Sequence, residues 1–177
     1  MLTDIDFASL SRYLLIYAVP PIVVALIALV YVFTRKRRAK MALKSMLLVD
    51  NLSGKDFERF LLFLFKRLGY KARLTRRGKD QGADLVIKKW IFWTAVQAKR
   101  YNGSVGNFAV QEVYASRKIY NCRKAMVVTN RTFTREAREL AEKNKVTLWD
   151  REKLLKAMTK AGITPKMVGR IVTRRKD

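Results

Sequence analysis

An uncharged apolar stretch near the N-terminus constrains this chain most strongly. Residues Tyr13 to Phe33 read YLLIYAVPPIVVALIALVYVF and contain no charged side chain. A helix of this length spans the hydrocarbon core of a bilayer, and tyrosines at both ends suit the membrane interfaces. We therefore expect a transmembrane helix at 13–33. It should kink at Pro20 and Pro21, because proline lacks the N–H that helical residues donate.

The charges after this stretch predict its orientation. Five of the six residues from Arg35 to Lys40 are Lys or Arg, and dense positive charge on one flank places that flank in the cytoplasm. We expect a single-pass protein of the inner (cytoplasmic) membrane with residues 1–12 outside. Residues 34–51 would form a basic juxtamembrane connector, and the remaining chain would lie in the cytoplasm.

The overall charge narrows the classes of partner. The chain holds 38 Lys and Arg against 14 Asp and Glu, a net charge of +24, and no histidine. Such an excess predicts a polyanionic partner, either nucleic acid or an anionic lipid surface. The absence of histidine excludes Ser-His-Asp catalysis and the histidine-containing zinc sites.

Hydrophobic periodicity predicts an α/β domain at 52–158. A capping pair, Ser53 and Asp56, begins a helix with an apolar stripe that ends at Gly69. Three strands, a helix, a strand, a helix, a strand and a last helix follow, and this order favours a mixed β-sheet flanked by helices. The expected ranges are 70–74, 85–87, 91–98, 105–120, 125–129, 134–143, 146–149 and 150–158. We interpret residues 159–177 as a loosely ordered basic C-terminal tail.

Polar side chains stand at the ends of two of these apolar runs. Asp84 precedes Leu85 to Ile87, and the next run ends in Gln97 and Lys99. Strand side chains alternate between faces, so Gln97 and Lys99 share a face, roughly 7 Å apart along the strand. If the two runs form a hairpin, Asp84 lies opposite Gln97. A carboxylate, an amide oxygen and an ammonium group would then meet at one end of the sheet.

These three groups suit metal-dependent phosphodiester hydrolysis. Asp84 and Gln97 would hold Mg²⁺ (or Mn²⁺), which keeps several of its waters, and Lys99 would face the reacting phosphate. By spacing alone the pattern is weak. A strand-end cap at Asp84, a surface glutamine at Gln97 and a solvated lysine at Lys99 are simpler interpretations. The hairpin turn also lacks the Gly, Asn or Asp that favoured turns use.

Several motifs taken together resemble the Mrr-type restriction endonuclease domain of the PD-(D/E)xK nuclease superfamily. The similarity extends from about residue 53 to 156, and the motifs occur in the same order. They are FE at 57–58, GY at 69–70, GKDQGAD at 78–84, QAKRY at 97–101, VVTN at 127–130 and FTREA at 133–137.

The resemblance implies a restriction-endonuclease-like fold and Mg²⁺-dependent endonucleolytic cleavage of DNA, without a small-molecule cofactor. By position it implies that Asp84 is the metal aspartate, Gln97 replaces the usual acidic ligand and Lys99 is the catalytic lysine. Glu58, which spacing alone favours as a solvated edge charge, would come to the metal from the first helix. Gln111 and Asp80 would support the site.

Cations near this site would contact DNA phosphates without reading sequence. The candidates are Arg76, Arg77, Lys79, Arg100, Arg131 and Arg135. The main hypothesis is a membrane-anchored DNA endonuclease, in which a homodimer would supply two sites for two strands. The alternatives are a non-catalytic DNA tether at the membrane, a junction-resolving or RNA-directed nuclease of the same fold, and a lipid-surface binder.

Overall fold

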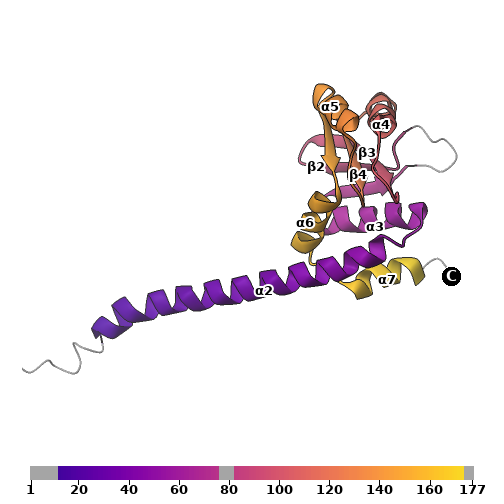
Figure 1. Ribbon diagram of the computed structural model, residues 1–177. Coiled ribbons are helices and arrows are strands. Elements are labelled where there is room, and N and C mark those ends of the chain that lie inside the picture. Colours follow the sequence, from indigo (N-terminus) through magenta and orange to yellow (C-terminus); the bar gives the residue numbers. More distant parts are fainter. Residues whose placement is uncertain (1–11, 76–81, 174–177) are drawn as a thin grey trace, which may run out of the picture. The chain divides into compact units, whose positions relative to one another are not determined.

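The computed structural model describes residues 12–75 and 82–173 (Figure 1). The chain forms two compact units, Met1–Arg37 and Arg38–Asp177. The first unit holds a π-helical turn, η1 (Leu14–Ala18), and the first part of α2 (Val19–Val49). From Ile16 to Val49 the helix is long and apolar enough to cross a membrane, and its most apolar window has no buried residue. These are properties of length and composition.

The π-helical turn lies directly before the two prolines. Pro20 and Pro21 donate no hydrogen bond, and their rings would collide with the carbonyl groups four residues earlier in a regular α-helix. Those carbonyl groups belong to Ile16 and Tyr17, which lie in η1. The π-helical turn thus lies at the prolines where the sequence predicted a kink, and the kink itself stays a prediction; sharp kinks occur at prolines and at π-bulges.

The second unit is built on a mixed five-stranded sheet. Its order is β1 (Lys71–Leu74), β2 (Leu85–Lys89), β3 (Phe92–Lys99), β4 (Lys124–Thr129) and β5 (Val146–Trp149). The first three strands pair antiparallel, and β3, β4 and β5 pair parallel. This confirms the predicted mixed sheet.

Helices cover both faces of this sheet. On one face, α3 (Gly54–Arg67), α6 (Arg151–Ala161), α7 (Pro165–Thr173) and the end of α2 pack with Leu85, Ile87 and Val96. On the other, α4 (Asn107–Ile119) and α5 (Arg135–Lys143) pack with Val86 and Ala95 (Figure 1). Alternate residues of β2 and β3 thus enter different cores, as strand geometry requires. We call the two sides the α3 face and the α4 face.

The expected capping pair begins α3. The Ser53 hydroxyl accepts a hydrogen bond from the N–H of Asp56 at 3.2 Å, and Phe57, Phe60 and Leu61 on the following stripe are fully buried. The helix ends before Gly69, which takes a positive φ of 83°. A residue without a Cβ adopts this conformation at little cost, so glycine stops the helix and lets the chain turn into β1.

Two segments are more regular than the sequence indicated. Residues up to Val49 continue α2, where the sequence predicted a connector, because Ala42, Met46 and Val49 form a buried stripe. The segment from Thr159 was expected as a loose tail. Instead α6 extends to Ala161 and α7 follows, with Ile163 and Val168 buried in the core.

A buried polar cluster joins the end of α2 to the sheet. One carboxylate oxygen of Asp50, Oδ1, accepts hydrogen bonds from Nη1 of Arg151 at 2.7 Å and from Nδ2 of Asn130 at 2.9 Å. The Oδ1 of Asn130 accepts the N–H of Tyr101 at 3.0 Å. Burial acts to raise the pKa of Asp50, but Arg151 and Asn130 together lower it below its ordinary value. The cluster fixes the chain where β3 and β4 end.

Candidate active site

The hairpin register places Asp84 opposite Gln97. Leu85 pairs with Val96, so the next position along brings Asp84 to Gln97, and the Asp84 N–H donates to the Val96 carbonyl at 2.9 Å. This confirms the predicted register. Trp90 makes the two-residue turn possible by taking a φ of 58°, a backbone conformation that residues other than glycine rarely adopt. The pairing of the two apolar strands therefore determines the register, although the turn sequence is unfavourable.

The Asp84 carboxylate is held by its neighbouring strands. Its Oδ2 accepts the N–H of Ala98 at 2.7 Å, while its backbone carbonyl accepts the N–H of Thr75 at 2.9 Å. The Thr75 hydroxyl also donates to the Ala83 carbonyl at 2.8 Å. The bond from Ala98 orients the carboxylate, whose oxygens are the ligand type that hard divalent cations prefer.

Gln97 carries an orphaned acceptor. Its side chain is 8% exposed, and its Oε1 is buried without a hydrogen-bond partner among the residues that the structure describes. An unsatisfied buried polar atom costs about 1–3 kcal/mol. This oxygen belongs to the residue opposite Asp84, where a hard cation would relieve that cost.

Lys99 pairs with a carboxylate on α4. Its Nζ lies 2.8 Å from Oε2 of Glu112, and the two side chains are 18% and 47% exposed. The loop before Asp84 also presses on this part of α4. Gly82 has a φ of 76°, and a Cβ there would lie 2.3 Å from the Glu112 carbonyl oxygen. Glycine is therefore required at 82 both for its backbone angle and for the close approach.

Glu112 is the residue that the sequence reasoning missed. The resemblance pointed to its neighbour Gln111, which is exposed in the structure. A usable signal was present, because Glu112 is the sole carboxylate of α4 and Lys99 lies on the strand face that this helix covers. Charge complementarity between the helix and the strand would have selected Glu112.

The sequence offered two other acidic candidates, Glu58 and Asp80. Glu58 is half-buried in the N-terminal half of α3, the helix that covers the face opposite α4. Its role at a metal remains a prediction. Asp80 lies outside the described residues, so its supporting role is a prediction too.

Three of the candidate DNA-binding cations can be located. Arg100 is half-buried; its Nη1 donates to Oδ1 of Asn102 at 3.3 Å and its Nε is buried without a partner in the described chain. Arg131 donates from Nε to the backbone carbonyl of Tyr101, the residue after Arg100, at 3.3 Å. Arg135 is exposed and pairs with Glu139 at 2.8 Å. The remaining candidates, Arg76, Arg77 and Lys79, lie outside the described residues.

The donor set suits a hard divalent cation bound mainly through water. In the described ranges 12–75 and 82–173, no three Asp, Glu, Cys or His side chains form a metal-binding group. One carboxylate oxygen of Asp84 and the orphaned amide oxygen of Gln97 are nevertheless the ligand types that Mg²⁺ accepts, because it retains several waters and needs few protein ligands. The set offers none of the histidine nitrogens or cysteine sulfurs on which protein zinc sites are mainly built.

Known structures resemble this fold. The DNA modification-dependent restriction endonuclease AspBHI aligns with a TM-score of 0.56 at 20% identity, over 76% of this chain and 40% of that one. A protein of unknown function, AF1548, aligns with a TM-score of 0.50 at 12% identity, over 70% and 97% of the two chains. MspJI restriction endonuclease, in complex with a 27-mer oligonucleotide, aligns with a TM-score of 0.48 at 19% identity, over 67% of this chain and 32% of that one. The chain thus spans less than half of AspBHI.

No curated protein matches the sequence. A family profile described as restriction endonuclease, Mrr_cat, matches residues 49–158, which is more than half of the chain. That range contains the whole sheet, the hairpin with Asp84, Gln97 and Lys99, and the helix with Glu112. The chain therefore belongs to the Mrr_cat restriction endonuclease family.

Proposed function

We propose that this protein is a membrane-anchored DNA endonuclease that depends on Mg²⁺ or Mn²⁺ and acts at the hairpin end that carries Asp84. The observation that supports this most directly is the buried Oε1 of Gln97, which lacks a donor in the described chain and belongs to the residue opposite Asp84. A binding module that only holds DNA needs cations, but it has no use for an orphaned acceptor beside a carboxylate.

Each residue would have a distinct role. Asp84, oriented by the N–H of Ala98, and Gln97 would hold the cation, with Glu58 completing the site from α3. Bound there, the cation would polarise the scissile phosphate and lower the pKa of a water molecule. Lys99 would orient that water or meet the charge that develops on the phosphate oxygens. Glu112 would keep the Lys99 amine in place through their 2.8 Å ion pair.

The cations around this edge would position the DNA. Arg100 and Arg131 are candidates for phosphate contacts, together with Arg135 and with Arg76, Arg77 and Lys79. Such contacts bind any sequence and weaken with salt. Cutting both strands calls for two sites, which a homodimer would supply.

The anchor would be the apolar helix at 13–33, with the nuclease domain in the cytoplasm. Flotation of the full chain with lipid vesicles tests this proposal. We expect the protein to float with the vesicles, and replacing Val23 and Leu26 together by arginine should abolish flotation, because each charge at the centre of a span costs about 2.5–3.5 kcal/mol. Flotation that persists in the double variant would argue against the anchor.

Plasmid cleavage tests the catalytic proposal. The full chain, in a non-ionic detergent, is incubated with supercoiled plasmid and either Mg²⁺, Mn²⁺ or EDTA. We expect nicking with a divalent ion only, lost in Asp84→Asn and Lys99→Met but retained in Lys143→Met, a control at an exposed lysine of α5. If all proteins bind DNA equally and none cuts linear or branched DNA or RNA, a non-catalytic tether is the better account. Cleavage of branched DNA or RNA alone would indicate a junction-resolving or RNA-directed nuclease.

A further inference from the structure

A concave site lies on the α3 face, away from Asp84 and Lys99. It is a cavity of about 300 Å³, near the lower end of the size range of small-molecule sites. Lys89, on its rim, is at the far end of β2 from Asp84, about 16 Å along the strand at roughly 3.3 Å per residue. Lys99, by contrast, pairs with Glu112 of α4 on the other side of the sheet. The proposed catalysis therefore makes no use of this cavity.

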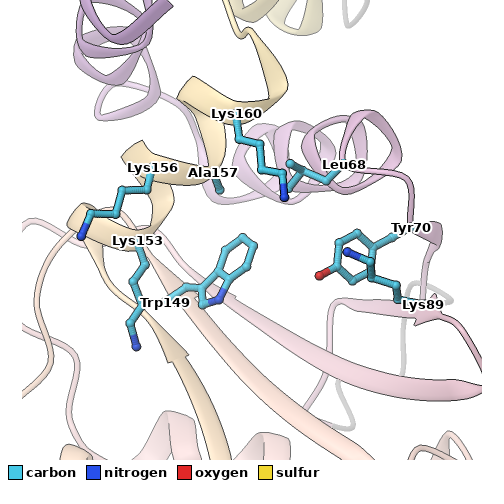
Figure 2. A pocket seen from close by; sticks show the side chains of 8 residues that line it. All are labelled: Leu68, Tyr70, Lys89, Trp149, Lys153, Lys156, Ala157 and Lys160. Carbon is cyan, nitrogen blue, oxygen red and sulfur yellow. The ribbon is translucent and has the colours of Figure 1, made fainter. Parts of the chain in front are cut away.

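Two aromatic side chains form its floor (Figure 2). The buried ring of Phe65 braces both: its centroid lies 5.3 Å from that of Trp149 and 5.4 Å from that of Tyr70, the latter in an edge-to-face arrangement. Because Phe65 is fully buried in the core, the two rings are held in place before any ligand arrives. Little conformational entropy would be lost on binding.

Four lysines surround this floor, and none of the described residues that line it is acidic. Lys153 donates to the Leu148 carbonyl at 3.0 Å and Lys156 pairs with Glu152. Lys89 lies 4.8 Å from the centre of the Tyr70 ring. The fourth, Lys160, makes no ion pair within residues 12–75 and 82–173. Figure 2 shows the Lys160 side chain reaching toward the space between the two rings, and Lys89 lying over Tyr70.

An aromatic floor with a basic rim has a specific chemical complement. Planar bases stack on aromatic side chains, and lysine amines bind phosphate oxygens. Duplex DNA cannot offer both groups to one cavity, because its bases are stacked and paired. We propose that this cavity binds a single nucleotide, with the base against Trp149 and Tyr70 and the phosphate at Lys89 and Lys160. The nucleotide is either free or at the end of a single strand.

Calorimetric titration of the full chain tests this proposal, in detergent and with EDTA, so that cleavage plays no part. The probes are AMP, ribose 5-phosphate and a 5′-phosphorylated single-stranded octanucleotide. We expect AMP to bind about tenfold or more tightly than ribose 5-phosphate, since stacking contributes about 1–3 kcal/mol per base and 1.4 kcal/mol is a factor of ten. If the octanucleotide competes with AMP, the site binds the ends of single strands. If it does not compete, the site binds free nucleotides.

Matched variants distinguish the cavity from general basicity. Lys89→Gln with Lys160→Gln removes two charges at the rim, whereas Lys118→Gln with Lys143→Gln removes two at exposed positions of α4 and α5. We expect the first pair to weaken AMP binding about tenfold and the second to leave it within about twofold. Equal losses in both pairs, equal affinities for AMP and ribose 5-phosphate, or no AMP binding would each overturn the proposal.

Discussion

Changing Gln97 to glutamate tests whether a cation binds at the hairpin edge. The introduced carboxylate would be buried and opposite Asp84, at a cross-strand Cβ separation of about 5 Å. Two unit charges at that distance repel by roughly 3 kcal/mol at an effective dielectric constant of about 20. Burial at a position that is 8% exposed adds to this cost. Without a divalent ion, Gln97→Glu should therefore destabilise the domain.

The assay is thermal unfolding of the full chain with EDTA or with millimolar Mg²⁺. At about 2–4 °C per kcal/mol, the repulsion should lower the midpoint by roughly 6–12 °C in EDTA. In Mg²⁺ the deficit should shrink by at least half, because a cation shared between two carboxylates converts repulsion into attraction. Gln111→Glu is the matched control, since it adds the same charge at an exposed position of α4. It should shift neither midpoint appreciably.

One result would refute the reasoning. If Gln97→Glu lowers the midpoint equally in EDTA and in Mg²⁺, with Mn²⁺ giving the same answer, no divalent ion is held between positions 84 and 97. The orphaned amide oxygen would then be only a local defect in packing.

Two further predictions concern ion pairs. Glu112→Gln should slow plasmid nicking about tenfold with little change in KM, because Lys99 loses the group that positions it. The unfolding midpoint should hardly move, since partly exposed pairs contribute at most about 1 kcal/mol; a large loss of stability with normal nicking would contradict a positioning role. Asp50 has a pKa below its ordinary value of 3.8, so its charge stabilises the fold above that pH and this contribution is lost as pH falls through the lowered pKa. The difference in unfolding free energy between the parent and Asp50→Asn should therefore be constant near neutral pH and vanish in acid. A difference that persists in acid would show that the contacts of residue 50 with Arg151 and Asn130 stabilise the fold independently of its charge.

The fold was largely predictable because strong periodic signals marked its elements. Alternation in 91–98 and the apolar run at 85–87 were sufficient to pair Asp84 with Gln97, although Trp90 and Ile91 form a turn that propensity disfavours. The buried strand interactions outweigh the strain at Trp90. Apolar residues at helical spacing also predicted α3 and its end at Gly69.

The remaining features depended on tertiary contacts that the sequence shows only weakly. The helix α7 is short, and its buried residue Val168 is identified as core only once α3 is in place beside it. Residues Ala42 and Met46 continue a helix because their stripe packs on the same core. At the candidate site, adjacent residues Gln111 and Glu112 point differently from one helix, and a shift of one position is beyond what spacing resolves.

The close approach at Gly82 has a consequence for the chemistry. A methyl group there would have to move about 1 Å to reach ordinary contact distance from the Glu112 carbonyl oxygen, which it would otherwise approach to 2.3 Å. The loop leads directly to Asp84, while Glu112 pairs with Lys99, so that displacement would change the position of Asp84 relative to Lys99. Misplacement of about 1 Å can cost about a hundredfold in rate. Gly82 therefore acts as a spacer: its missing side chain helps to set the distance between Asp84 and Lys99, the two groups that the proposed mechanism brings to one phosphate.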